Sequence, residues 1–380
     1  MLLTNALVFY NGKFEEKEIR IINGVFESIE SPGMLDFIED EEILDAKGKR
    51  VLPGLVDIHS HGRIGVDFSF ADVDALERIS ESYTESGVTS VLATTMTNEP
   101  ETVKRSVAAF RKFCDKNGEA STKARIIGIH MEGPFLGEKK KGAHDPKYLQ
   151  LPDTRFYEEM QNLSGNKLLL MAIDPELPGA EELVRKSRGE GVAISLGHTA
   201  CNYGLACEAA DWGADHVTHL FNAMQPLHHR EPGLIGAAVD KGMYVELICD
   251  GIHLHPSIIR MMFKVCPEKV VLISDSMPAA GLTDGEYELG GIKVYVKDGK
   301  ATQEDGTIAG STISVYDAMV NAIRFGIPAE QAVLSASYIP AKSVGLERKV
   351  GSIGIGYNAD FLIVDENWNL EDVYLGGRKC

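Results

Sequence analysis

Residues 124–146 read ARIIGIHMEGPFLGEKKKGAHDP, an apolar run followed by a histidine, a glutamate and a Gly-Pro turn. The apolar part, Ala124 to Ile129, has the length and the isoleucine content of a buried strand. Glu132 comes soon after it, and His144 lies further along the same loop. Because the carboxyl ends of barrel strands carry ligands and catalytic groups, both side chains are candidates for binding a metal ion or polarising a carbonyl. For Glu132 alone, an ordinary solvated turn is the alternative.

Eight short apolar runs of this kind follow one another through the middle of the chain. Helical patterns separate most of them; between residues 72 and 86, for example, Val73, Leu76, Ile79 and Tyr83 recur at helical spacing. Strands that alternate with helices in this way predict an α/β fold, and eight of them complete a closed (β/α)8 barrel like that of metal-dependent hydrolases. The runs are residues 55–62, 90–93, 124–129, 168–173, 192–196, 216–220, 244–249 and 270–274.

Both ends of the chain are rich in strand patterns. Residues 18–29 alternate around Asn23-Gly24, the preferred pair for a tight hairpin turn, and residues 359–364 and 373–375 are again strand-like. Neither end easily forms a core alone, so we expect residues 1–52 and 352–380 to pair into a small β-sandwich domain beside a barrel of residues 53–351. A Gly290-Gly291 turn between alternating runs predicts a β-hairpin inserted near residues 284–304.

Two histidines, His59 and His61, end the first apolar run, which reads LVDIHSHG. On a strand, residues i and i+2 point to the same side, so we expect both imidazoles to face one metal ion in the barrel mouth. The alternative is a pair of polar residues that simply leaves the strand.

Three more candidates lie where later strands end. His198 follows the strand in SLGHT and His219 lies in HVTHLFNAM, and either one alone is more often a core or loop histidine. With Glu132 they make a carboxylate and two imidazoles, the kind of set that holds zinc in hydrolases and leaves a position for water. Asp275, in SDSMPAAG, ends the last strand and is a candidate for proton transfer, with a helix-cap or turn aspartate as the alternative.

The composition restricts the partners and the location. A formal charge of −18 disfavours nucleic acids and anionic membranes, which need a basic face. No apolar run is long enough to span a membrane and the first residues lack the pattern of a secretory signal, so we expect a cytoplasmic protein without nucleic-acid or membrane partners. The six cysteines lack CxxC spacing and are expected to be free thiols.

The order HxH, Glu, His, His, Asp along a barrel resembles the amidohydrolase superfamily. Within it, the motifs are similar to those of the N-acetylglucosamine-6-phosphate deacetylases across residues 54–314, and the flanking β segments fit as well. HxEGPF together with GAH is highly specific, whereas GLVDIHSHG is shared across the superfamily. The matching motifs are GLVDIHSHG, HMEGPFLGEKKKGAHDP, SLGHT, THLFNAM, REPG, CDGIHLHP, SDSMPAAG and GTIAGSTIS.

This resemblance implies ligands for one or two divalent metal ions per chain. Glu132, His198 and His219 would bind the tightly held ion, with zinc as the first expectation and iron as the alternative. His59 and His61 would add a second ion bridged by Glu132, because some members of the family replace these histidines and hold one metal only.

The resemblance also implies catalytic and substrate-binding roles. Asp275 would act as general base and acid, and His144 would polarise the acetamide carbonyl. Arg230 suits a phosphate because its guanidinium bonds two oxygens at once, with an ordinary polar loop as the alternative. Apart from the resemblance, the three lysines at residues 139–141 are expected to lie in a solvated loop, with attraction of an anionic substrate toward an acidic protein as a further role for their charge. The positions implied for the sugar and the phosphate are Ala143, Asn222, Ala223, Arg230, Asp250, Gly251, Ile252, His253, Ile308, Ala309 and Gly310.

The reaction implied by the resemblance is hydrolysis of N-acetyl-D-glucosamine 6-phosphate to D-glucosamine 6-phosphate and acetate, by a homodimer, in aminosugar catabolism or cell-wall recycling. Two alternatives remain open. Another amidohydrolase, acting on an N-acyl substrate or on a cyclic amide like dihydroorotase or hydantoinase, would share HxH and the late aspartate; the cyclic-amide enzymes typically use a carboxylated lysine where this chain has Glu132. A scaffold barrel without activity would be expected to lack ligands, and every expected ligand is present here.

Overall fold

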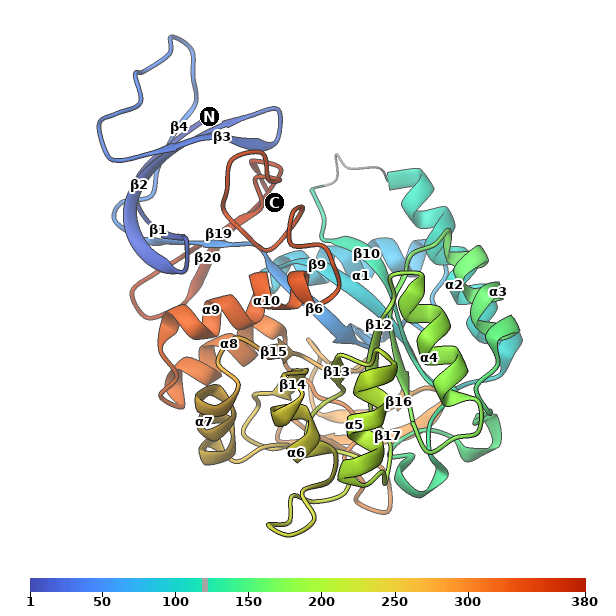
Figure 1. The fold of residues 1–380 in the computed structure, drawn as a ribbon. Coiled ribbons are helices and arrows are strands. Elements are labelled where there is room, and N and C mark those ends of the chain that lie inside the picture. Colours follow the sequence, from blue (N-terminus) through green and yellow to red (C-terminus); the bar gives the residue numbers. More distant parts are fainter. Residues whose placement is uncertain (118–121) are drawn as a thin grey trace.

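Eight parallel strands form the centre of the molecule in a computed structural model that describes residues 1–117 and 122–380 (Figure 1). Neighbours in this sheet are also neighbours among its strands in sequence, which is the order of a (β/α)8 barrel and confirms the predicted fold class. A small hairpin of β7 (Gly62–Arg63) and β8 (Val66–Asp67) follows the first strand. The barrel strands are β6 (Leu55–Ser60), β9 (Val88–Thr95), β10 (Arg125–Glu132), β11 (Leu168–Ile173), β12 (Ala193–Leu196), β13 (His216–Val217), β14 (Tyr244–Ile248) and β15 (Val270–Ile273).

The first and last strands meet and close the ring beside the predicted site. The backbone N–H of Asp275 donates to the carbonyl of His59 over 2.9 Å, and that of His61 donates to the carbonyl of Ser276 over 2.8 Å. Ser60 and Ser276 also form a parallel bridge. The closing hydrogen bonds therefore join the two segments that carry the histidine pair and the candidate aspartate.

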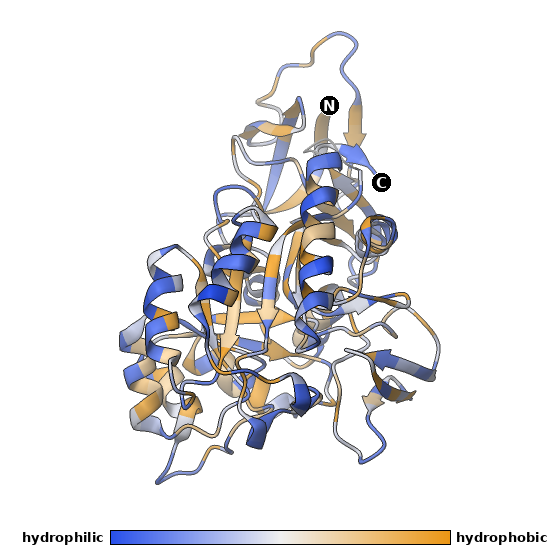
Figure 2. Ribbon diagram, turned by 90° about the vertical axis from the view of Figure 1, so that its right-hand side faces the viewer, coloured by the Kyte–Doolittle hydropathy of each residue, from blue (hydrophilic) through white to orange (hydrophobic). Residues whose placement is uncertain are grey.

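Amphipathic helices surround the barrel. In α1 (Val73–Glu85), Leu76, Ile79 and Tyr83 are buried, and the Asp72 side chain caps the first turn by accepting a backbone hydrogen bond. Figure 2 shows hydrophilic residues over much of the helix surfaces and apolar residues along the barrel strands. Within residues 1–117 and 122–380, no helix is both long and apolar enough to cross a membrane. The other helices are α2 (Pro100–Asn117), α3 (Thr154–Ser164), α4 (Ala180–Gly189), α5 (Tyr203–Trp212), α6 (Gly233–Asp240), α7 (Pro256–Val265), α8 (Val315–Arg324), α9 (Ala329–Ala336), α10 (Tyr338–Ser343) and the short 3-10 helices η1 (Glu138–Lys140) and η2 (Pro146–Tyr148).

The two ends of the chain pair in a second sheet, as the sequence predicted. β5 (Arg50–Pro53) runs parallel to β1 and antiparallel to β19, so it joins strands from both ends. β2 and β3 form the expected hairpin at Asn23-Gly24, with both residues in the left-handed region that this turn requires. Hydrogen bonds link all these strands in one continuous sheet, and the division into domains after residues 52 and 351 stays a prediction. The other strands are β1 (Leu2–Tyr10), β2 (Lys13–Ile22), β3 (Val25–Glu30), β4 (Ile43–Asp45), β19 (Phe361–Val364), β20 (Leu370–Leu375) and β21 (Arg378–Lys379).

A small sheet is inserted after the last barrel strand. It has three antiparallel strands, β16 (Gly285–Leu289), β17 (Ile292–Lys297) and β18 (Lys300–Thr302), because the chain turns a second time after β17 and pairs with it again. Two barrel loops hold its first turn. Asn98 Nδ2 donates to the Gly290 carbonyl over 2.8 Å, and the Gly290 N–H donates to a carboxylate oxygen of residue 67 over 2.8 Å.

Candidate metal centre and active site

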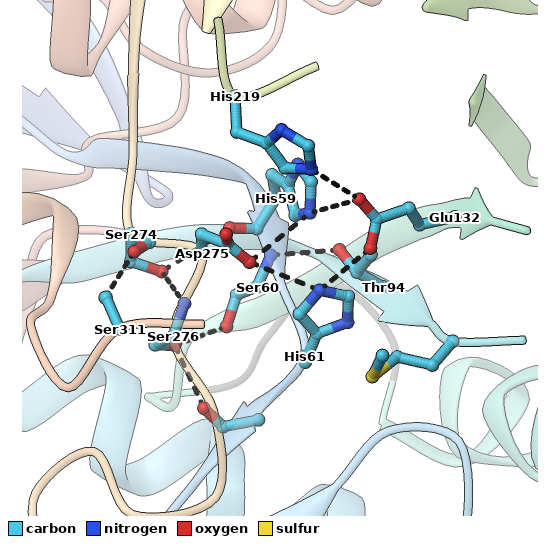
Figure 3. A network of polar contacts seen from close by, with 12 residues as sticks. His59, Ser60, His61, Thr94, Glu132, His219, Ser274, Asp275, Ser276 and Ser311 are labelled. Atoms are coloured by element: carbon cyan, nitrogen blue, oxygen red, sulfur yellow. Dashed lines mark hydrogen bonds and ion pairs between the residues drawn. The ribbon is translucent and has the colours of Figure 1, made fainter. Parts of the chain in front are cut away.

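Glu132, the last residue of β10, lies at the centre of a group of buried side chains (Figure 3). Its Oε1 is 3.1 Å from His198 Nε2 and 3.0 Å from His219 Nε2, and the two nitrogens are 3.0 Å apart. His198 follows β12 and His219 follows β13, so three strand ends bring these atoms together. Two imidazole nitrogens and a carboxylate oxygen that converge at this spacing match the donors of a divalent metal ion.

A second group of possible ligands shares Glu132. His61 Nε2 is 3.1 Å from Glu132 Oε2 and 3.2 Å from Asp275 Oδ1. His59 Nε2 is 3.6 Å from Glu132 Oε1 and also 3.6 Å from Asp275 Oδ1. The two histidines therefore converge from the end of β6, as their spacing predicted, and Asp275 meets them from the end of β15 (Figure 3).

Hydrogen bonds on the far side of two imidazoles turn their Nε2 atoms toward the centre. His59 Nδ1 lies 2.8 Å from Glu246 Oε2, and His198 Nδ1 lies 2.9 Å from the Lys140 carbonyl. Both partners are acceptors, so each Nδ1 donates to its partner, and each Nε2 is the atom turned toward the centre that a metal ion would bind in place of a proton. His59 Nε2 is buried and has no hydrogen-bond partner among the described residues, as expected of a ligand atom. The donor set fits a divalent metal ion, and these residues form a divalent-metal site.

Three of these residues have backbone conformations that the surrounding structure must maintain. His198, His219 and Asp275 have φ of 49°, 30° and 48°, in the left-handed region that costs a non-glycine residue about 1 kcal/mol or more. Two of them are held by hydrogen bonds: Glu246 accepts from the His219 N–H over 3.2 Å, and the carbonyl of His59 accepts from the Asp275 N–H over 2.9 Å. The strained turns at these strand ends thereby aim the side chains at one centre.

The two carboxylates stay ionised despite their burial. Burial by itself raises the pKa of Glu132, but the charge of His59 and hydrogen bonds from other histidines hold that pKa well below its ordinary value. Burial also opposes ionisation of Asp275, whereas His59 and His61 lower its pKa to about 2. For His61, burial lowers the pKa, yet the two carboxylates raise it to about 9. The negative charge of the two carboxylates, which favours the protonated form of His61, also favours binding of a divalent cation.

His144 reaches Glu132 from the loop after β10 and has a different environment. Its Nε2 is 3.4 Å from Glu132 Oε2, while its Nδ1 accepts a hydrogen bond from the Thr97 N–H over 3.2 Å. Burial lowers the pKa of His144 to about 4, so the ring is neutral at neutral pH. Because Nδ1 is the acceptor, the proton lies on Nε2, which makes His144 a neutral hydrogen-bond donor beside the metal site.

A cavity of about 390 Å³ lies at this site. The site residues that border it are His61, Glu132, His144, His198, His219 and Asp275. Residues from several barrel loops and from the inserted sheet complete the lining. The predicted substrate residues in it are Ala143, Asn222, Ala223, His253, Ile308 and Gly310. Residues that we did not predict to bind substrate also line it, namely Met96, Lys139, Lys140, Gly142, Leu289 and Thr307. Two of the three lysines at residues 139–141, for which a solvated loop is the first expectation, therefore border the cavity.

Of the turn after β14, residues 250–253, only His253 borders the cavity among the described residues. Asp250 accepts from the N–H groups of Ile252 and His253, each over 2.8 Å, and lies 2.6 Å from His253 Nδ1. These contacts orient His253, which is the member of this turn that borders the cavity. Gly251 and Ile252 are exposed, and Ala309 is buried in an apolar cluster beside the lining.

Arg230 lies away from the cavity of its own chain. It is exposed on the loop between β13 and α6, where its Nη1 is 2.7 Å from His229 Nε2. Among the described residues, the set that borders the cavity does not include it. Its predicted contact with a phosphate stays a prediction.

Glu246 is a site residue that was not predicted from the sequence. It lies in β14 with no exposed surface and contacts both His59 and the backbone of His219. The feature of the sequence that could have revealed it is a lone glutamate inside the apolar run YVELI. A carboxylate buried in such a strand must have a polar partner nearby. Thr97 was missed as well, and its backbone contact with His144 leaves no trace in the sequence.

The amidohydrolase family model matches residues 50–379, and the chain therefore belongs to the amidohydrolase family. The barrel and the shared histidines and acids are in keeping with this assignment.

Within the family, the chain is similar to several deacetylases of phosphorylated amino sugars. It is 37% identical over 320 residues to the N-acetylglucosamine-6-phosphate deacetylase of Bacillus subtilis (strain 168), covering 83% of this chain and 81% of the relative. It is 32% identical over 380 residues to the N-acetylgalactosamine-6-phosphate deacetylase of Escherichia coli O157:H7, covering 100% and 98%. A solved structure of a variant Mycobacterium smegmatis N-acetyl-D-glucosamine-6-phosphate deacetylase, in complex with N-acetyl-D-glucosamine-6-phosphate, has a TM-score of 0.91 at 30% identity, covering 100% of this chain and 98% of that one.

Proposed function

We propose that this protein hydrolyses N-acetyl-D-glucosamine 6-phosphate to D-glucosamine 6-phosphate and acetate. The observation that carries the proposal is the convergence of a neutral donor, His144, and a carboxylate, Asp275, on the metal site in the wall of one cavity. Amide hydrolysis needs a donor for the carbonyl oxygen and a group that moves a proton from water to the amine. The deacetylases among its relatives support the choice of substrate.

The metal ligands, Asp275 and His144 each have a separate role in the proposed reaction. A divalent ion held by Glu132, His198 and His219 would supply Lewis acidity that activates water and polarises the carbonyl. Asp275 takes a proton from the attacking water while the water oxygen bonds to the acetyl carbon. The Nε2–H of His144 stabilises the negative charge that develops on the carbonyl oxygen. The C–N bond then breaks, and Asp275 returns the proton to the amine, so that acetate and the free amino sugar leave.

The rest of the cavity suits a phosphorylated sugar. Asn222 and Thr307 offer polar groups for hydroxyls, and Lys139, Lys140 and His253 offer cations or donors for a dianion. In a chain with a net charge of −18, local lysines are needed to attract an anionic substrate. The alternative of a cyclic-amide hydrolase loses support because Glu132 occupies the position of a carboxylated lysine.

We infer that zinc occupies the site, with iron as the alternative, and that His59 and His61 hold a second ion for which Glu132 is the shared ligand. Imidazole nitrogens with carboxylates suit either metal. Replacing His59 and His61 together with alanine should lower the metal content per chain by one ion. An unchanged metal content would show that these histidines hold none.

We further propose a cytoplasmic homodimer that serves aminosugar catabolism or cell-wall recycling. The exposed position of Arg230 favours a dimer, since this side chain needs a second copy or a moved loop to meet a phosphate. Replacing Arg230 with alanine should weaken binding of the phosphorylated sugar far more than that of the unphosphorylated one.

The decisive experiment is acetate release by metal-loaded protein, with the metal counted in the same sample. The substrates are N-acetylglucosamine 6-phosphate, its galactosamine epimer, unphosphorylated N-acetylglucosamine and dihydroorotate. We expect fast release from the glucosamine phosphate and little from the unphosphorylated sugar. A preference for the galactosamine epimer would make N-acetylgalactosamine 6-phosphate the substrate, as the name of the Escherichia coli relative states for that protein. Turnover of dihydroorotate alone would reject the proposed deacetylase function.

A further inference from the structure

The cavity has two chemically different sides. Counting round the barrel from β6, β9 is second and β13 is sixth of the eight strands, so they stand opposite each other. Asn222 and Ala223 follow β13, and His253 follows β14, so this side offers the polar side chains of Asn222 and His253. Met96 follows β9 directly and borders the cavity from the other side.

Met96 and Leu289 make this second side apolar. Leu289 is the last residue of β16 and reaches the cavity from the inserted sheet. The two side chains are 3% and 2% exposed and belong to one apolar cluster with Met277 and Ala309. A Cβ added at Gly290 would lie 3.1 Å from Met96 Sδ, so the turn next to Leu289 packs closely on Met96. The cluster therefore supports this wall from behind.

Polar contacts fix the position of this wall. Asn98 holds the carbonyl of Gly290 and Asp67 holds its N–H, each over 2.8 Å. Both belong to loops of the barrel, whereas Gly290 belongs to the inserted sheet. Leu289 is therefore tied to the same barrel loop that carries Met96, and the wall is rigid before any ligand arrives.

We propose that Met96 and Leu289 form the subsite for the alkyl end of the acyl group and limit its length. The inference rests on the proposed function. An amide carbon carries three substituents that point in three directions within one plane. When the nitrogen leads to a sugar on the β13 side and the oxygen meets the His144 donor, the methyl group points away from the sugar, toward the β9 side. That side presents an apolar wall of the kind a methyl group requires.

Such a wall predicts selectivity by chain length. A propionyl group adds one methylene, which must displace Met96 or Leu289 against the cluster behind them. One methylene against an apolar wall changes kcat/KM by roughly tenfold or more. The wild-type protein should therefore prefer N-acetyl over N-propionyl glucosamine 6-phosphate by at least that factor.

The experiment compares kcat/KM for the N-acetyl, N-propionyl and N-butyryl glucosamine 6-phosphates. Met96→Ala and Leu289→Ala should each raise the propionyl-to-acetyl ratio roughly tenfold, because each opens the wall. Asn98→Ala should raise the ratio less, since it frees the turn without widening the cavity itself. The ratio is measured on one protein sample, so a lower active fraction in a variant cancels.

Val296→Ala is the matched control, because Val296 belongs to the same apolar cluster on the inserted sheet but does not border the cavity. It should leave the ratio unchanged. Ratios that stay at the wild-type value in both wall variants, while the acetyl substrate is still turned over, would overturn the subsite. A metal-loaded wild-type protein that turns over none of the three substrates would instead overturn the proposed function, and the subsite with it.

Discussion

Glu132 is the residue on which both groups of metal ligands depend. Its Oε1 faces His198 and His219, and its Oε2 faces His61. The sequence placed it at the end of a buried strand, and the fold surrounds it with imidazoles that lower its pKa. A carboxylate in this position holds ligands from opposite parts of the chain together.

Asp275 is expected to transfer protons. Asp275→Asn keeps the size and polarity of the side chain but removes the basic oxygen, so kcat should fall by roughly 100-fold to 10,000-fold with KM little changed. Steady-state kinetics and metal content would be measured together. The exposed Asp115, changed to asparagine, is the control and should behave as wild type. A fall in metal content that matches the fall in kcat would make Asp275 a ligand rather than the proton carrier.

Glu246 is expected to orient the metal ligands without touching the substrate. Glu246→Gln removes the charge that holds His59 Nδ1, so metal affinity should fall by roughly 10- to 100-fold. Competition with a chelator measures this affinity, and Glu268→Gln, on an exposed turn before β15, is the control. Wild-type metal affinity in Glu246→Gln would mean that a hydrogen bond to His59 Nδ1 is enough to orient the imidazole, without the negative charge of the glutamate.

At the scale of elements, strand ends and the loops after them build the site. The ends of β6, β10, β12, β13 and β15 each supply a ligand or an acid, and residues 133–153 fold back to add His144. Three of these strand ends carry residues in the left-handed region, so the turns themselves are under strain. The short strands before them are fully buried, which gives the turns a rigid base.

The 3-10 helix η1 brings two lysines to the cavity, and we expect them to attract the phosphate. Replacing Lys139 and Lys140 with alanine should raise KM for the phosphorylated sugar by roughly three- to tenfold and leave the unphosphorylated sugar unaffected. The effect should shrink as salt is added, because both side chains are partly exposed. Lys147→Ala, on the same loop but outside the lining, is the control. Equal losses for both sugars would indicate a change of loop structure instead.

At the scale of the whole molecule, β10 connects the two sheets. Its first residue, Arg125, pairs with Asp360, which directly precedes β19 of the terminal sheet, and its last residue is Glu132. Asp360 also accepts from the Gly376 N–H over 2.8 Å. The strand that carries the central carboxylate therefore begins at the contact between barrel and terminal sheet.

This contact should contribute measurably to stability. Arg125→Ala leaves the carboxylate of Asp360 buried without its partner, so the free energy of unfolding should fall by about 1 to 3 kcal/mol. Urea unfolding measures the change, with Arg155→Ala as the control because that side chain is 87% exposed. Equal stabilities of Arg125→Ala and wild type would show that this ion pair does not stabilise the contact between the two sheets.

Much of this arrangement was readable from the sequence, because it follows from local rules. Buried strands alternate with amphipathic helices, which predicts the barrel, and an Asn-Gly pair predicts the first hairpin. His59 and His61 face one point because of strand periodicity. Glu132, His198, His219 and Asp275 stood out because polar side chains followed apolar runs.

The tertiary structure decided what depends on distance between remote residues. It gave Glu132 partners on both of its oxygens, placed Glu246 behind His59, and fixed the tautomer of His144 through the backbone of Thr97. It also brought Leu289 beside Met96, which no spacing in the sequence predicts. The reason is physical: periodicity reports which face of an element is buried, whereas the partner across a cavity is set by how the barrel closes and how the inserted sheet packs on it.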